Sequence, residues 1–238
     1  IKLAVGASLA SGFSRAQETA PQKKLGWALV GLGSLSKNQI APALLKTQFS
    51  KLSAVVTGTP AKGVEWREKY GLAENKVYNY ENFDKILEDK EIDVVYIVLP
   101  NSMHHEYVIR AAKAGKHVFC EKPMANTAKE CREMIAACEA AKVKLGVAYR
   151  CQFEAHHKEA IRLAKEKVFG AVKHVNAEFG FKIGDPKQWR LRKPLAGGGA
   201  LMDVGVYALN ACRYLTGEEP VEISALETKT DAVKLDRK

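Results

Sequence analysis

The sequence predicts an α/β fold, in which a doubly wound parallel sheet is followed by the start of an α+β domain. Two observations support this prediction. Between residues 25 and 150, short apolar runs alternate with stretches of helical length, as in parallel sheets covered on both faces by helices. After Arg150 this alternation stops, and a charged helix, a glycine-rich loop and an apolar helix follow instead.

Six buried strands are expected in the first part of the chain. Each is a short run of mainly apolar residues that is bounded by turn-forming or helix-forming residues. The strongest, DVVYIVLP, is continuous, rich in β-branched residues and ended by proline. In chain order the expected strands are residues 27–31, 52–58, 77–80, 93–100, 117–120 and 144–149.

Helices are expected between these strands. Pro42 is tolerable because it stands near the first turn of its helix. Thr127 and Glu130 have the T-x-x-E spacing of a capping box, which opens the last helix of the series. The expected helices are residues 37–46, 60–70, 82–88, 104–114 and 128–142.

Residues 151–238 are predicted to begin a second domain with an open, mainly antiparallel sheet. We expect a helix over residues 154–168, a strand over 172–181, a helix over 200–215 and a further strand from 221. Two strands and two helices do not close such a sheet, so we expect this domain to be incomplete in the chain.

Residues 1–24 are expected to lie outside the fold. The run from Leu3 to Ala16 is apolar and free of acidic residues, and Ser14 and Ala16 resemble the small residues before a signal-peptidase site. This indicates the remnant of an export signal of twin-arginine type, then a polar linker, and predicts a periplasmic or otherwise exported protein. The run is too short to span a membrane. The alternative is a disordered arm on a cytoplasmic protein, and fractionation of cells would separate the two.

The composition favours an anionic small-molecule partner. The chain carries a net charge of +10, but its lysines are spread out and no arginine-rich block is present, which argues against nucleic acid. The five cysteines include no CxxC pair, and their odd number argues against a disulfide framework. The adjacent pairs His104-His105 and His156-His157 point apart on helices, so no metal site is expected.

A glycine-rich motif follows the first expected strand. In VGLGSLS, Gly31 permits a tight turn and Gly33 lets the backbone approach a pyrophosphate, with Ser34 and Leu35 completing the loop. Ser36 replaces the usual third glycine and is small enough for close packing of the helix. The motif alone would also fit a plain turn. Before a helix in a six-strand βα series, it predicts a Rossmann dinucleotide-binding domain over residues 25–150.

The end of the second strand bears on the choice of dinucleotide. An NAD site usually carries an acidic residue about 20 positions after the glycine motif, where it bonds the ribose hydroxyls. Here the segment contains Thr57, Gly58, Thr59 and Lys62 and no carboxylate. Two hydroxyls and a lysine suit a 2′-phosphate, so we predict NADP rather than NAD. Equal affinity for both would contradict this.

The end of the strongest strand is expected to border the cofactor through Leu99, Pro100 and Asn101. Since His104 follows one helical turn later, Asn101 and His104 are candidates to lie near the nicotinamide ribose. The alternative is that Asn101 or Ser102 caps the next helix.

The fifth strand ends in the sequence Glu121-Lys122-Pro123. The proline restricts Lys122 to extended backbone, which would direct the lysine over the cleft. An ordinary strand-to-helix turn is the alternative. Glu121 is either a neighbour of the cofactor or a structural partner of Lys122.

The apolar helix after the glycine-rich loop carries Asp203 and Tyr207, which are four residues apart and share one face. A buried aspartate needs a partner, and Lys122 is the natural one. An ammonium near Tyr207 would lower the pKa of its phenol toward neutral pH and make it a usable acid or base. The alternative is a structural ion pair.

These motifs together resemble one family. The segments VGLGSLS, VVYIVLPNSMHHEYVIRAAKAGKHVFCEKPMA, YRCQF and QWRLRKPLAGGGALMDVGVYALNACRYLTGEEP are similar to the glucose–fructose oxidoreductase/inositol dehydrogenase (Gfo/Idh/MocA) family. The resemblance implies that Lys122, Asp203 and Tyr207 form the catalytic group. It also implies that Trp189 and Arg190 lie along the cofactor, with Arg150 as a further candidate.

The resemblance implies hydride transfer between a sugar or polyol and a nicotinamide dinucleotide, by a homo-oligomer (dimer or tetramer) that keeps its cofactor bound. Two alternatives stay open. One is a glycosidase of the same superfamily that uses NAD transiently, and the other is a non-catalytic dinucleotide-binding protein. The presence of Lys122, Asp203 and Tyr207 argues against the second.

Overall fold

The fold is centred on one parallel sheet. The structure is a computed structural model that describes residues 23–226. Its six strands all run parallel, in the order β3-β2-β1-β4-β5-β6, which is the doubly wound arrangement predicted from the sequence. The strands are β1 Leu25–Val30, β2 Ser50–Val56, β3 Val77–Tyr78, β4 Val94–Ile97, β5 His117–Glu121 and β6 Leu145–Ala148.

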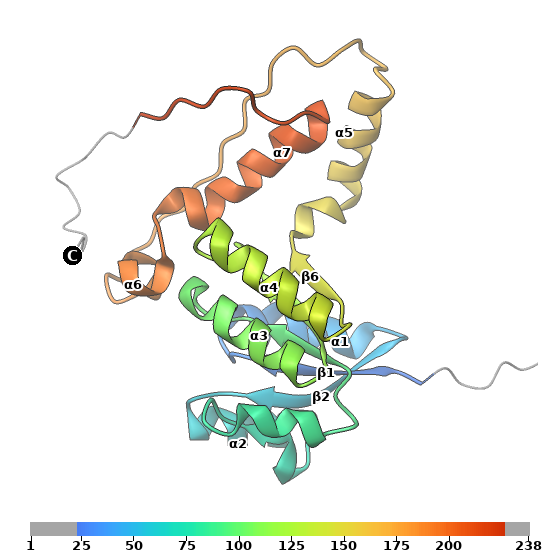
Figure 1. Ribbon diagram of the computed structural model, residues 1–238, viewed down its shortest axis with the longest axis vertical. Coiled ribbons are helices and arrows are strands. Elements are labelled where there is room, and N and C mark those ends of the chain that lie inside the picture. The colour runs from blue at the N-terminus through green and yellow to red at the C-terminus, as the bar shows by residue number, and fades with distance from the viewer. Residues whose placement is uncertain (1–22, 227–238) are drawn as a thin grey trace, which may run out of the picture.

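Helices cover both faces of this sheet (Figure 1). Successive residues of a strand point to opposite faces, so Leu29 packs in one core and Val30 in the other, both without exposed surface. Burial of such a side chain contributes about 1.5–3 kcal/mol. The Val30 core includes residues of α3 His104–Lys113 and α4 Ala128–Ala140, and the Leu29 core includes residues of α1 Ala41–Lys46 and α2 Pro60–Tyr70.

The capping signal predicted for the last helix of the domain is confirmed, whereas one expected α-helix takes another form. Thr127 and Glu130 form the expected capping box at the start of α4, and Gly71, with φ of 63°, ends α2. The segment expected to be an α-helix over residues 82–88 is instead a 3₁₀ helix, Phe83–Glu88. Its apolar residues Phe83 and Ile86 are three apart, so the 3₁₀ repeat is enough to bury both.

Between β6 and residue 226 the chain forms helices without a sheet. α5 Ala155–Lys165 packs against α7 Val206–Thr216, and the short α6 Lys193–Ala196 precedes the π-helical turn Leu201–Gly205 that leads into α7 (Figure 1). None of the helices within residues 23–226 is long and apolar enough for a membrane crossing.

Residues 172–181 form no strand, so the prediction of one there is wrong. Residues 221–226, the described part of the last expected strand, form none either. An extended segment becomes a strand only when it pairs with a neighbour, and no such neighbour stands beside these segments in residues 23–226. The expected export signal falls outside the described residues, as does the rest of the segment that begins at residue 221.

Candidate active site

A groove of about 480 Å³ runs along the carboxyl edge of the sheet. Its walls come from the loop after β1, the ends of β2, β4 and β5, and segments near residues 190 and 203. Every residue predicted to bind cofactor lines this groove except Ser36, His104 and Arg150. The lining residues are Gly31, Leu32, Gly33, Ser34, Leu35, Thr57, Gly58, Thr59, Lys62, Tyr80, Val98, Leu99, Pro100, Asn101, Glu121, Lys122, Trp189, Arg190 and Asp203.

The loop after β1 has the properties that a phosphate-binding turn needs. Gly31 has φ of 93°, and a Cβ there would lie 2.2 Å from the carbonyl oxygen of Val98, so a side chain is excluded. At Gly33 a Cβ would meet no atom within 4 Å, which leaves the backbone open to the groove. This combination fits the pyrophosphate of a dinucleotide.

Ser36 supports this loop from behind. Its side chain is fully buried, and its hydroxyl donates a 2.6 Å hydrogen bond to the carbonyl oxygen of Gly31. The expected close packing at this position is confirmed. The assignment of Ser36 as a direct cofactor contact is corrected, because no part of it reaches the groove.

The far end of the groove is lined by Thr57, Gly58, Thr59 and Lys62, as the sequence predicts for the adenosine end. Tyr80 joins them, and a Cβ on Gly58 would lie 2.8 Å from its ring. The sequence analysis did not identify Tyr80, because it lies 22 residues after Gly58 and only the β2–β3 pairing brings them together. The acidic residues that line the groove, Glu121 and Asp203, lie at its opposite end.

Asn101 lines the groove, although its amide is occupied. It is 3% exposed, and Nδ2 donates a 2.9 Å hydrogen bond to the carbonyl oxygen of Ala196. The alternative that Asn101 or Ser102 caps the next helix is not observed, because α3 begins after Met103 without a side-chain cap. Asn101 thus ties α6 to the Rossmann domain and holds the Trp189–Arg190 segment next to the groove.

His104 is a positioning residue and not a cofactor contact, which corrects the sequence-based assignment. Its side chain has no exposed surface. Nδ1 lies 2.8 Å from the carbonyl oxygen of Pro123 and Nε2 lies 2.9 Å from that of Leu99. Burial lowers the pKa of this imidazole. His104 therefore packs between the end of β4 and the turn that carries Lys122, and as a neutral imidazole with one N–H it donates to one of the two carbonyl oxygens.

The predicted pairing of Lys122 with Asp203 is confirmed. Lys122 Nζ lies 3.0 Å from Asp203 Oδ1 and also donates to the backbone carbonyl of Asp203. Asp203 Oδ2 accepts a 2.8 Å bond from Nε of Arg190. The Lys122 and Asp203 side chains are 13% and 14% exposed, so the pair is largely shielded from water. An ammonium has three donors, so Lys122 retains one for a ligand in the groove.

Lys122 lies next to Tyr207, as predicted, but the pKa of the phenol is not lowered. Lys122 Nζ lies 5.1 Å from the centroid of the Tyr207 ring, over its face. Burial, followed by the charge of Glu121, raises the pKa of Tyr207 to about 12, and Arg150 opposes this rise. The pKa of Tyr207 is therefore raised in the free protein, and not lowered as the sequence led us to expect.

Neighbouring aromatic rings fix the orientation of Tyr207. The ring of Tyr149 meets it edge-on at 6.2 Å between centroids, and that of Phe179 does so at 5.7 Å. Neither ring was identified from the sequence, because these contacts depend on how α7 packs against Tyr149, directly after β6, and against the segment after α5, which carries Phe179.

Glu121 is a structural partner of Tyr96. Its Oε1 accepts a 2.6 Å hydrogen bond from the Tyr96 hydroxyl, and burial raises the pKa of this carboxyl. Tyr96 is held in turn by edge-on contacts with Trp27 and Phe119, at 6.1 and 5.0 Å between centroids. Glu121 therefore bonds Tyr96, and not Lys122 as one of the two alternatives predicted, and it also borders the groove, as the other alternative predicted.

A second hollow of about 510 Å³ adjoins the groove. The two share Leu35, Glu121 and Lys122, and the hollow is also lined by Arg150 and Tyr207. Arg150 therefore faces this hollow and not the groove. Lys122 lines both spaces, and Tyr207 lines the hollow.

The fold and site define a dinucleotide-binding protein with a Lys–Asp–Tyr group at the end of its groove. Residues 25–149 match the oxidoreductase family described as "NAD-binding Rossmann fold" (GFO_IDH_MocA), and residues 157–237 match the "GFO/IDH/MocA C-terminal domain". The chain belongs to the Gfo/Idh/MocA oxidoreductase family.

Several similar proteins are named for carbohydrates. The chain is 31% identical over 223 residues to D-xylose 1-dehydrogenase [NADP(+)] of Haloarcula marismortui, covering 91% of this chain and 62% of that one. It is 31% identical over 221 residues to levoglucosan dehydrogenase of Pseudarthrobacter phenanthrenivorans, covering 87% and 55%. A crystal structure of aldose–aldose oxidoreductase from Caulobacter crescentus with glycerol is similar at 52% identity and a TM-score of 0.82, covering 84% and 59%. The chain thus spans about three fifths of the length of such relatives.

Proposed function

We propose that the whole protein is an NADP-dependent oxidoreductase that transfers hydride between the cofactor and a sugar or polyol. The observation that carries this proposal is that Lys122 lines both the groove and the adjoining hollow, while Tyr207 lines the hollow beside it. The groove suits a dinucleotide, because its glycine loop is open at Gly33. The hollow adjoins the end of the groove where the nicotinamide of such a cofactor would lie.

Each residue of the group has a distinct role in this proposal. The bound nicotinamide would accept hydride from the carbon that carries the reacting hydroxyl. Lys122 holds the substrate oxygen with its remaining donor and stabilises the negative charge that develops there. Tyr207 exchanges the hydroxyl proton. Asp203 and Arg190 hold Lys122 in position through the two carboxylate oxygens.

The substrate class rests on the relatives. The D-xylose and levoglucosan dehydrogenases and aldose–aldose oxidoreductase are named for carbohydrates, and a Lys–Tyr pair suits the alcohol or carbonyl of any of these. We further propose a protein similar to glucose–fructose oxidoreductase, in which the cofactor stays bound while one sugar is oxidised and another is reduced.

The test uses the full-length form of the protein, purified without added cofactor. We expect absorbance to reveal bound NADP, an aldose to raise the reduced band, and a second sugar such as fructose to lower it. No response to any aldose or polyol would contradict the proposed activity. Release of an aglycone without net cofactor reduction would favour the glycosidase alternative.

The preference for NADP is expected to depend on Lys62. Substitution Lys62→Ala removes the cation at the adenosine end of the groove, and a hydrogen bond to a charged group contributes about 1.5–3 kcal/mol. We therefore expect the Kd for NADP to rise roughly 10- to 150-fold while the Kd for NAD stays the same. Titrations of protein stripped of cofactor would measure both. Lys69→Ala, on the same helix but outside the groove, is the matched control.

A further inference from the structure

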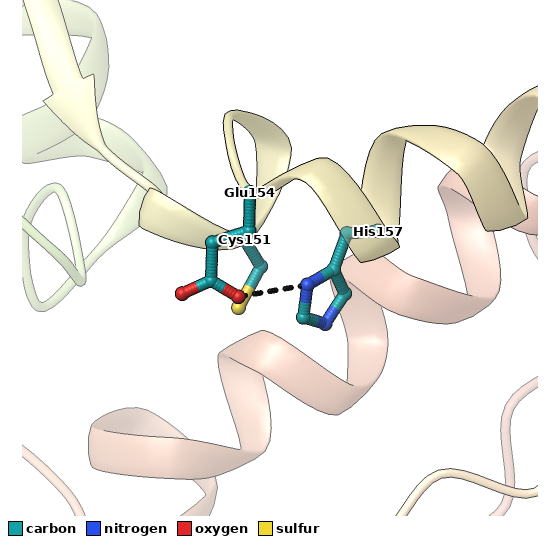
Figure 2. A group of neighbouring side chains, drawn as sticks. All are labelled: Cys151, Glu154 and His157. Atoms are coloured by element: carbon teal, nitrogen blue, oxygen red, sulfur yellow. Dashed lines mark ion pairs between the residues drawn. The ribbon is translucent and has the colours of Figure 1, made fainter.

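A cluster of three different metal-binding side chains lies just after β6, outside the groove. Cys151 belongs to the 3₁₀ turn Arg150–Gln152, Glu154 is the N-cap residue of α5, and His157 lies in the first turn of that helix. The spacing of three residues between successive members places them on one side of this turn. Figure 2 shows the three side chains pointing toward one another.

The potential ligand atoms are already close together. The Cys151 sulfur, a Glu154 oxygen and a His157 nitrogen all lie within 4.8 Å of one another. Glu154 Oε2 and His157 Nδ1 are 2.8 Å apart, as the dashed line in Figure 2 marks. Ligands about 2.0–2.3 Å from a tetrahedral metal stand roughly 3.3–3.8 Å from each other. Small side-chain rotations would therefore complete the geometry.

Arg150 orients the carboxylate of this cluster. Its Nη1 lies 2.5 Å from Glu154 Oε1, on the opposite oxygen from the one that faces His157. Glu154 thus has one oxygen held by an outer partner and one directed toward the imidazole. Bound metals commonly have carboxylate ligands that are fixed by outer hydrogen bonds in this way.

We propose that Cys151, Glu154 and His157 form a zinc-binding site. A thiolate, an imidazole nitrogen and a carboxylate oxygen suit Zn²⁺, whereas Mg²⁺ and Ca²⁺ require mainly oxygen ligands. Cys151 is a free thiol. A hollow of about 410 Å³, lined by Cys151 and His157, gives access for the ion and room for water as the fourth ligand. The site does not depend on the proposed oxidoreductase activity.

No metal site was expected from the sequence, because it contains no CxxC pair and its adjacent histidines point apart. His156 takes no part in this cluster, consistent with the expectation that adjacent side chains diverge. The cluster instead combines a cysteine, a glutamate and a histidine, each three residues after the one before. The turn before α5 brings their side chains together.

Titration of the 1–238 chain with Co²⁺ tests the site, because cobalt replaces zinc and absorbs light. We expect one ion per chain, a thiolate-to-cobalt absorption band, intense tetrahedral bands in the visible region, and displacement of all of them by one equivalent of Zn²⁺. Cys151→Ser should abolish the thiolate band, and His157→Asn and Glu154→Gln should each weaken binding about tenfold or more.

Matched controls separate this site from binding by any surface thiol or imidazole. Cys131→Ser removes another partly exposed cysteine, and His156→Asn removes the neighbouring histidine of the same helix. Both should leave the titration unchanged. A thiolate band that persists in Cys151→Ser, or equal affinity of the original chain and the Cys151→Ser/His157→Asn double variant, would overturn the proposal.

Discussion

Replacement of Lys122 by methionine is expected to lower kcat by about 10³-fold with little change in NADP affinity. Two of the three donors of Lys122 are used by Asp203, and the third is the one that faces a substrate oxygen at the junction of groove and hollow. Methionine has similar length and no donor, so the developing charge loses its partner. Steady-state kinetics and a cofactor titration on the same preparation measure the two effects.

This substitution also leaves the buried carboxylate of Asp203 with Arg190 as its remaining ionic partner. Removing one member of a buried ion pair can cost about 3–5 kcal/mol of folding free energy, so lost activity needs a stability control. Arg190 still pairs with Asp203 Oδ2 in this variant, so we expect thermal unfolding to show a folded protein that has lost its turnover. Turnover near that of the original protein in the folded variant would show that Lys122 is not required for the chemistry.

The sequence predicted the Rossmann domain well because its signals are local. Apolar runs of four to seven residues, the glycine motif and the Thr127–Glu130 capping box each act within a few residues of the chain. Most of the groove followed from these signals, since parallel strands bring their carboxyl ends to one edge. The Lys122–Asp203 pair followed from a different argument, that an aspartate in an apolar helix requires a cation.

The errors concern features that depend on three-dimensional surroundings. Ser36 and His104 have suitable chemistry and positions in the chain, but both are completely buried and bond backbone carbonyls behind the groove. Tyr80 lines the groove although no motif contains it, because the pairing of β2 with β3 brings it there. The strand expected over residues 172–181 failed because extended backbone needs a partner that local sequence does not specify.

The pKa of Tyr207 is the most informative of these errors. The sequence placed a lysine near the phenol, and the structure confirms their proximity. However, the ammonium lies over the ring face and is bound to Asp203, so burial and the charge of Glu121 prevail and raise the pKa of Tyr207 to about 12. Burial and the charge of Glu121, and not the nearby ammonium, therefore set the direction of the shift.

Substitution Tyr207→Phe is therefore expected to reduce turnover by about 10²–10⁴-fold while leaving NADP binding intact. The ring contacts with Tyr149 and Phe179 are kept, so the variant should fold normally. Tyr149→Phe removes a hydroxyl from the adjacent ring and is the matched control, with turnover within a few-fold of the original. Equal losses in both variants would show that packing, and not proton exchange, determines the effect.

The raised pKa of Tyr207 also predicts the pH dependence of the proposed reaction. With a pKa of about 12, only about 10⁻⁵ of the phenol is ionised at pH 7, and this fraction grows tenfold per pH unit. Sugar oxidation, which needs the phenolate as base, should therefore accelerate steadily from pH 6 to 10. Sugar reduction, which needs the neutral phenol as acid, should change little over the same range. Tyr207→Phe should abolish the slope in the oxidative direction, and a plateau below pH 8 in the original protein would assign the proton transfer to another group.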